Sequence, residues 1–271
     1  MMKAWQGWML AAMLPCSALA TAVEPPEASA ATLQAAVGGH RLIVLGELHG
    51  TREVPALAGA LAQRYTAAGE PVVIALELPR DGNAAVRRYL ATDGSAQARR
   101  QLLAERFLRP PAPAHDGRRN QAVVELIEQV RVLRRHGRDV AVVLIDVEQS
   151  RGDAAWRDRR MARTLRAVAA ALPRGRVIAV VGNVHAMRVR PEGPRWPKAL
   201  QTPMAAHLAD LMPYTVEVTA RQGAFWACAS AGRCGVQAIP ASAARSRPLD
   251  DHQPWHYRLV LPQLTPAAVL R

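Results

Sequence analysis

The residues best suited to chemistry lie in two short elements of one form, glycine-x-x-histidine. One is Gly46–His49, with the sequence Gly-Glu-Leu-His, and the other is Gly182–His185, with the sequence Gly-Asn-Val-His. An imidazole titrates near neutral pH, so it can move a proton or bind a metal. The glycine lets the backbone turn sharply or lets a ligand approach closely. Each element is therefore a candidate part of a functional site.

The spacing within the elements predicts which side chains act together. Side chains two positions apart in an extended segment point to the same side. Glu47 and His49 can therefore face one cavity, as can Asn183 and His185. The two elements differ in one respect, because the first carries a carboxylate beside its histidine and the second carries an amide.

Four short apolar runs are the elements that must position these residues. Continuous apolar runs are typical of strands buried on both faces of a parallel sheet, and segments with helical spacing lie between them. The predicted strands are Leu42–Leu45, Val72–Leu76, Val140–Ile145 and Val177–Val181. The predicted helices are Glu53–Tyr65, two short ones within residues 82–107, one that spans residues 123–133, and Ala155–Leu172. We expect an α/β fold, with a central, mainly parallel sheet flanked by helices on both faces and a C-terminal β segment.

Polar residues follow all four predicted strands. Glu47 and His49 follow the first, Glu77 the second, Asp146 the third and His185 the fourth. Ligands of open parallel sheets bind outside the carboxyl ends of the strands. The sequence therefore predicts that these side chains converge on one cleft edge. The alternative for any single residue is structural, a carboxylate that caps a helix or a histidine in the core, but buried ionisable groups are costly unless they are paired or used.

Two imidazoles and two carboxylates suit two kinds of site, and the sequence leaves both open. One is a divalent metal site, for Mn, Co or Zn, with His49, Glu77, His185 and Glu47 as ligands. The other is metal-free acid–base hydrolysis, in which a histidine activates water and a carboxylate sets its tautomer and charge.

A second set of polar residues is expected around the first: Asp116, Arg118, Asp146 and Asn183. Arg157, at the start of a predicted helix, is a candidate catalytic residue. An arginine at a cleft can hold a carboxylate or an oxyanion through its planar fork. The alternatives are a surface ion pair for each arginine and a helix cap for Asp116.

The C-terminal part departs from the strand–helix alternation. Thr215–Ala220 and Tyr257–Leu261 look like strands without helices after them, and we expect an antiparallel edge or hairpin that carries a cysteine loop. Cys228 and Cys234 lie in that loop. In an exported protein two nearby cysteines are expected to form a disulfide, because no other cysteine pair completes a metal site.

The N-terminus has the pattern of a secretory signal. A basic start, a short apolar run and small-x-small sites predict a signal peptide over residues 1–22, followed by a flexible linker over residues 23–36 and a single domain over residues 37–268. The mature chain would then be periplasmic or secreted, without a transmembrane span.

Composition narrows the functional classes. Half of the 271 residues are apolar and only 4% are aromatic, so the core must be aliphatic. The formal net charge is +13, but the arginines are spread along the chain and no nucleic-acid motif is present, so we expect a solvated basic surface and no nucleic-acid partner. The chain has no Gly-x-Ser-x-Gly elbow, phosphate-binding glycine loop or His-Glu-x-x-His helix.

Four motifs, in this order, resemble a known superfamily: Leu45–Gly50 (LGELHG), Ala75–Pro79 (ALELP), Arg157–Ala162 (RDRRMA) and Val181–His185 (VGNVH). The group that they resemble unites the erythromycin esterases, the TIKI and TraB/PrgY proteins and the haem-binding ChaN lipoproteins. The tail over residues 257–266 is also similar to the end of such domains.

The resemblance implies an α/β/α sandwich with its site at the strand ends. Glu47, His49, Glu77 and His185 match the acidic and histidine positions of the group, and Arg157 matches the arginine of its Arg-x-x-x-Met-Ala element. These positions are tied to metal-dependent peptide cleavage in the TIKI branch and to lactone hydrolysis in the esterase branch, whereas the ChaN branch binds haem.

We therefore expect a periplasmic or secreted hydrolase that cleaves an ester, lactone or peptide bond in a small molecule or a peptide. The alternative is a non-catalytic protein that binds haem or a metal.

Overall fold

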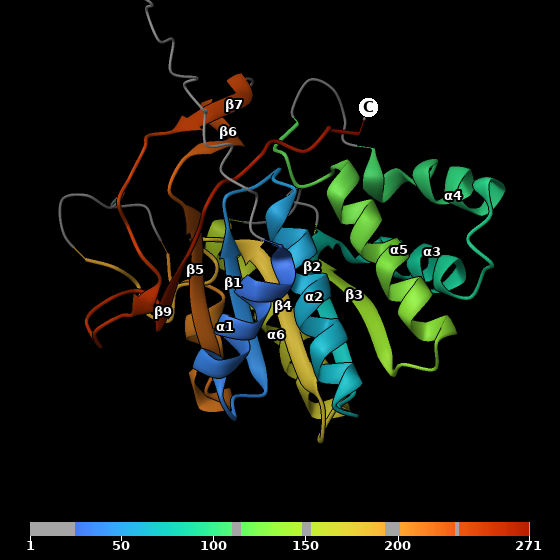
Figure 1. The fold of residues 1–271 in the computed structure, drawn as a ribbon, viewed down its shortest axis with the longest axis horizontal. Helices are drawn as coiled ribbons and strands as arrows, with labels where there is room; N and C mark the ends of the chain where they lie inside the picture. Colours follow the sequence, from blue (N-terminus) through green and yellow to red (C-terminus); the bar gives the residue numbers. More distant parts are fainter. Residues whose placement is uncertain (1–24, 110–114, 148–152, 193–200, 231–232, 271) are drawn as a thin grey trace, which may run out of the picture.

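The computed structural model describes residues 25–109, 115–147, 153–192, 201–230 and 233–270. Seven strands form the main sheet, in the order β3-β2-β4-β1-β5-β9-β8 (Figure 1). The first six are parallel to one another, and only the short β8 runs antiparallel. The strands are β1 (Leu42–Glu47), β2 (Val72–Pro79), β3 (Val140–Asp146), β4 (Arg176–Gly182), β5 (Tyr214–Ala220), β8 (Arg247–Pro248) and β9 (Tyr257–Leu261).

Helices cover both faces of this sheet, as predicted. Figure 1 shows α1 and α2 on the near face and α6 behind it. The helices are α1 (Pro26–Val37), α2 (Glu53–Ala67), α3 (Asn83–Leu90), α4 (Ala96–Leu103), α5 (Gln121–Arg135) and α6 (Ala154–Ala171), with short 3-10 turns η1 (Arg80–Gly82), η2 (Arg106–Leu108) and η4 (Ala205–Leu211). Within the described ranges, none of the helices combines the length and apolar character needed to cross a bilayer.

The position of β1 between two layers of helices explains why its sequence is continuously apolar. Ile43 and Leu45 belong to the core on the side of α1, α2 and α5, whereas Leu42 and Val44 belong to the core on the side of α6 and η4. All four are buried. A strand with helices on both faces has no solvent side, so the alternation of polar and apolar residues disappears.

The predicted linker is wrong over most of its length. Residues 26–37 form α1, in which Ala30 and Leu33 are fully buried. The alanines that suggested flexibility are strong helix formers, and Pro26 occupies the first helical position, where it needs no hydrogen bond. Packing against α2 supplies the apolar contacts that a linker would lack. The predicted signal peptide lies outside the described residues.

The predicted arrangement of the tail also needs correction. β5 and β9 do not form an antiparallel edge, because β5 pairs in parallel with β1 and β9 pairs in parallel with β5. The chain between them forms a separate antiparallel hairpin, β6 (Gly223–Ser230) and β7 (Arg233–Ile239). This hairpin carries the cysteines, and Cys228 and Cys234 form the predicted disulfide.

Candidate functional site

The carboxyl ends of β1, β2, β3 and β4 lie side by side and bring the predicted residues together. Glu47 pairs with Gly182 across β1 and β4, and Pro79 pairs with Asp146 across β2 and β3. The strand order therefore places both glycine-x-x-histidine elements next to each other, with the acidic residues of β2 and β3 beside them.

Each glycine of the two elements makes room for the other element. A Cβ atom on Gly46 would lie 2.8 Å from the Cβ of Ala186 and 3.0 Å from the Cα of Asn183. A Cβ atom on Gly182 would lie 2.9 Å from Nε2 of His49. Contacts of that length are not tolerated without displacement, so the glycines are required by the close packing of β1 and β4.

The His49 ring is held by one carboxylate. Its Nδ1–H donates to Oε1 of Glu47 at 2.9 Å, because an ionised carboxylate can only accept. The Nε2 atom has no hydrogen-bond partner among the residues that the structure describes, and the side chain is 24% exposed. Neutral His49 thus has an unshared electron pair on Nε2, which lies close to Gly182 of β4.

Charge around His49 favours its protonated form. Burial by itself lowers the pKa of the imidazole, but the hydrogen bond to Glu47 and the negative charges of Glu77 and Glu47 outweigh it. The pKa of His49 is therefore raised above its ordinary value. A base whose conjugate acid is stabilised in this way is suited to take a proton from water.

The His185 ring is held at both nitrogens. Nη1 of Arg157 donates to Nε2 of His185 at 2.8 Å, and Nδ1 of His185 lies 2.6 Å from Oδ1 of Asp158. A guanidinium can only donate, so Nε2 must be the acceptor and the ring proton must sit on Nδ1, facing Asp158. The second histidine is thereby fixed in one tautomer, with neither nitrogen free.

Asp158 is a site residue that the sequence reasoning missed. Its side chain is buried, and its only described role is to fix the tautomer of His185. The signal was present, because Asp158 lies in the Arg157–Ala162 motif. That motif directed attention to its arginine alone.

Two carboxylates and two guanidiniums form the buried centre of the site. Arg157 donates to both oxygens of Asp146, at 2.8 and 2.7 Å, and also to Glu77. Arg118 donates from Nη1 to Glu77 at 3.0 Å and to Asp146 at 2.7 Å. The remaining oxygen of Glu77 accepts the backbone N–H of Gly182 at 2.6 Å.

The charges of this centre lock its protonation states. Burial by itself raises the pKa of Glu77, but the positive charges around it, those of Arg157 and Arg118 among them, outweigh it and hold that pKa well below the usual range. Burial by itself lowers the pKa of Arg118 and of Arg157, but their carboxylate partners raise both. Glu77 therefore stays ionised and fully hydrogen-bonded, and it acts as a structural counter-charge rather than as a base.

Asp116 positions Arg118 instead of capping a helix. Its Oδ2 accepts from Nε of Arg118 at 2.7 Å, and its Oδ1 accepts the backbone N–H of the same residue at 3.1 Å. Burial raises the pKa of Asp116, but the charge and hydrogen bonds of Arg118 lower it overall. The cap of α5 is Asn120, whose side chain accepts from the N–H of Val123.

Asn183 contributes through its backbone. Residues 183–186 form a turn, so the expected extended spacing of Asn183 and His185 does not occur. The N–H of Asn183 donates to the carbonyl of Glu47 at 3.0 Å, and its own carbonyl accepts from the indole of Trp255. Within the described chain, its side-chain amide makes no hydrogen bond.

The β6–β7 hairpin supports the loop that carries His49. The backbone N–H of Trp226 donates to the carbonyl of His49 at 2.9 Å. A Cβ atom on Gly50 would lie 2.7 Å from the Trp226 side chain, and one on Gly117 would lie 2.5 Å from it. Sequence reasoning placed the cysteines in this segment but did not connect the tryptophan to the site.

The donor set does not fit a divalent cation. Both oxygens of Glu77 and both ring nitrogens of His185 are already hydrogen-bonded, and two guanidiniums lie at the centre. In the described parts of the chain, no three histidine, cysteine or acidic side chains are grouped to hold a metal.

The chain is similar to known proteins in structure but not in sequence. No known family profile and no curated protein sequence matches this chain. An erythromycin esterase mutant in its open conformation superposes with a TM-score of 0.65 at 13% identity, over 89% of this chain and 95% of that one. A succinoglycan biosynthesis protein superposes with a TM-score of 0.64 at 11% identity, over 88% of this chain and 91% of that one.

A third structure, a protein from Bacillus cereus, superposes with a TM-score of 0.58 at 10% identity, over 89% of this chain and 92% of that chain. These matches extend over almost the whole of each chain. The chain therefore has the erythromycin esterase-like fold that the sequence motifs implied, and the predicted α/β class is confirmed.

Proposed function

We propose that the protein hydrolyses an ester or lactone bond, with His49 as the general base and without a metal. One observation carries the proposal. His49 has a carboxylate on Nδ1, an unpartnered Nε2 and access to solvent, which is the arrangement of a base held ready for a proton. The erythromycin esterase-like fold supports the choice of an ester or lactone over a peptide.

In the proposed reaction, Nε2 of His49 takes a proton from water as the oxygen attacks the carbonyl carbon. Glu47 stabilises the imidazolium that forms. The carbonyl π electrons move to oxygen, which becomes an oxyanion. The positive charge of Arg118, which lies on the more exposed side of the buried centre, stabilises this oxyanion. The carbon–oxygen single bond then breaks, and His49 returns the proton to the leaving alkoxide, which gives an acid and an alcohol.

His185, Asp158 and Arg157 are positioning residues in this proposal. Arg157 is only 9% exposed and contacts Glu77, Asp146 and His185. It therefore fixes the buried carboxylates rather than meeting the substrate. This proposal differs from the sequence-based expectation, in which Arg157 and His185 were candidate catalytic residues.

The test is hydrolysis of matched ester, lactone and peptide substrates by the wild-type protein and by the His49→Asn and His185→Asn variants. We expect cleavage of an ester or lactone that His49→Asn abolishes. Peptide cleavage without ester cleavage, or full activity in His49→Asn, would reject the proposal.

The metal and haem expectations are tested on the same preparation. Elemental analysis is made before and after reconstitution with Mn, Co or Zn, and haem is titrated by absorbance. Stoichiometric metal that is lost in both Glu47→Ala and His185→Ala would replace the metal-free mechanism by a metal-assisted one. A strong Soret shift that survives His49→Ala and His185→Ala would favour the haem-binding alternative.

We also propose that the protein is exported. The Cys228–Cys234 disulfide supports this, since structural disulfides form and persist in oxidising compartments. The N-terminal sequence of the protein recovered from its producing cells tests the proposal: a start after residue 20 or 22 supports cleavage, whereas an intact Met1 opposes it.

A further inference from the structure

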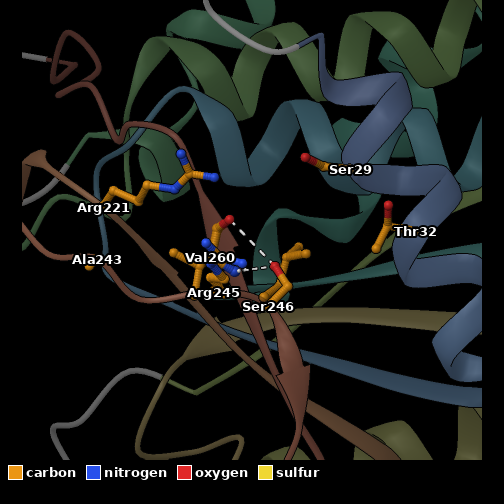
Figure 2. Close-up of a pocket in the computed structure, with 8 residues that line it drawn as sticks. Ser29, Thr32, Arg221, Ala243, Arg245, Ser246 and Val260 are labelled. Atoms are coloured by element: carbon orange, nitrogen blue, oxygen red, sulfur yellow. Dashed lines mark hydrogen bonds between the residues drawn. The ribbon is translucent and has the colours of Figure 1, made fainter.

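A hollow lies between α1 and β9, away from the residues around His49. Its volume is about 570 Å³, within the range of small-molecule sites. Figure 2 shows its walls: two hydroxyl residues of α1, two residues of β9, and the chain that follows β5 and precedes β8. The lining residues are Ser29, Thr32, Arg221, Ala243, Arg245, Ser246, Leu259 and Val260. None of them belongs to the site around His49.

Two arginines give the hollow a positive charge. Arg221 and Arg245 both line it, and no acidic residue does. Within the part of the chain that the structure describes, neither guanidinium has a hydrogen-bond or ion-pair partner. Other arginines of the sheet are paired, such as Arg176 with Glu70 and Arg258 with Glu217. Two unpaired guanidiniums in one hollow are suited to an anion.

Ser29 adds a hydroxyl donor to the lining of the hollow. The residue is only 6% exposed, yet its hydroxyl has no hydrogen-bond partner among the described residues. Figure 2 shows its oxygen on the side of α1 that faces the arginines. Thr32 and Ser246, by contrast, bond to backbone atoms of Ala28 and Val260. The Ser29 oxygen is not one of the buried side-chain atoms that lack a partner, so it is open to the hollow, where an anion could accept its hydrogen bond.

An apolar hollow adjoins the charged one, because Ser29 lines both. Its volume is about 130 Å³. Its walls are mainly apolar and come from the start of α1, the first turn of α2 and the chain after β9: Pro26, Ala56, Leu57, Leu261 and Pro262, with Arg52, Glu53 and Gln263 at its polar margin. The two hollows together offer cationic donors at one end and apolar surface at the other.

We propose that this pair of hollows binds a small amphiphilic anion, a medium-chain carboxylate. The carboxylate accepts hydrogen bonds from Arg221, Arg245 and Ser29, and the alkyl chain lies against Leu57 and Leu261. The charged end selects for an anion and the apolar end for a chain, so both parts of the ligand are needed. This site is independent of the proposed hydrolysis.

The test is isothermal titration calorimetry with octanoate on the full-length protein. We expect saturable binding that Arg221→Ala/Arg245→Ala weakens by at least about tenfold, since a charged pair of hydrogen bonds is lost. Ser29→Ala should weaken it less. Arg247→Ala is the matched control, because Arg247 is an exposed neighbour that does not line the hollow. Circular dichroism confirms that each variant is folded.

Three further titrations separate the contributions of the charge, the alkyl chain and the His49 site. Acetate tests the charge alone and octanol tests the chain alone, and we expect both to bind at least about tenfold more weakly than octanoate. His49→Asn should bind octanoate as the wild type does. Equal binding of octanol, equal binding by the double arginine variant, or loss of binding in His49→Asn would overturn the proposal.

Discussion

The two glycine-x-x-histidine elements are alike in sequence and differ in what surrounds their rings. His49 bonds to Glu47 of its own element and leaves Nε2 open. His185 bonds to Asp158 and Arg157, both from α6, and has no open nitrogen. The same motif thus gives a histidine with one unbonded ring nitrogen in one place and a histidine bonded at both nitrogens in the other. The partner residues, rather than the motif, decide what each histidine can do.

The largest expected effect comes from exchanging the two histidines in turn for asparagine. His49→Asn removes the proposed base, and we expect kcat/KM to fall by about 10²–10⁴-fold with little change in stability. His185→Asn removes the acceptor for Arg157 and the donor to Asp158. We expect it to lower the free energy of unfolding by roughly 1–3 kcal/mol.

Kinetics and urea unfolding of both variants measure these effects. The comparison fails if His185→Asn is as stable as the wild type and lowers kcat/KM as much as His49→Asn does.

The next effect is on stability and concerns the buried centre. Arg157→Met leaves Glu77 and Asp146 with one guanidinium instead of two, and we expect the free energy of unfolding to fall by roughly 3–5 kcal/mol. Arg163→Met on the exposed side of α6 is the control and should change it by less than about 0.5 kcal/mol. Chemical denaturation measures both, and equal stability of the two variants would contradict the role given to Arg157.

A smaller effect is expected where the two elements touch. A Cβ atom on Gly182 would lie 2.9 Å from Nε2 of His49, so Gly182→Ala must displace the ring. We expect a roughly 10–100-fold loss in kcat/KM, because small displacements of a reacting group are costly. Gly39→Ala, in open space, is the control. Unchanged kinetics in Gly182→Ala would show that the position of Nε2 does not matter to the reaction.

The smallest expected effect is a shift in the pH profile. The pKa of His49 is raised, largely by Glu47, so activity should rise as pH rises through that pKa and the base loses its proton. Glu47→Gln removes the negative charge beside His49 and should therefore shift the rise in activity to lower pH. Protonated His49 stabilises the folded protein. Its contribution to the free energy of unfolding is therefore complete at pH values below the pKa of this histidine in the unfolded chain, and it is lost as pH rises through the raised pKa in the folded protein.

Imidazole NMR titration of His49 in the wild type and in Glu47→Gln measures the shift directly. A pKa of His49 that is unchanged or higher in Glu47→Gln would show that Glu47 does not raise the pKa of His49.

The sequence predicts the strand-end residues well because their placement follows from topology. Once four apolar strands are parallel, Glu47, Glu77 and Asp146 must lie at one edge, and the structure brings them there. The predicted helices and buried strands are also present, at similar bounds. These features depend on short-range patterns and on one rule of sheet geometry.

The features that sequence reasoning missed depend on contacts between distant segments. Asp158 meets His185 only because α6 packs behind β4, and Trp226 meets His49 only because the hairpin folds over the strand ends. The helix α1 was misread as a linker because Ala and Pro are also common in flexible segments. The burial of Leu33 and Val37 distinguishes a packed helix from a flexible linker, but this burial depends on contact with α2, which the local sequence does not show.

The β6–β7 hairpin has a consequence for how such a protein can diversify. It leaves the main sheet after β5, and the chain then returns to β9, the strand beside β5. A segment inserted between two adjacent strands can change length and sequence without altering their order. The disulfide ties its two strands together, and Trp226 joins it to the loop of His49. Exchange of this one hairpin is therefore a route by which evolution or an engineer could alter the surroundings of His49 while the buried charges stay untouched.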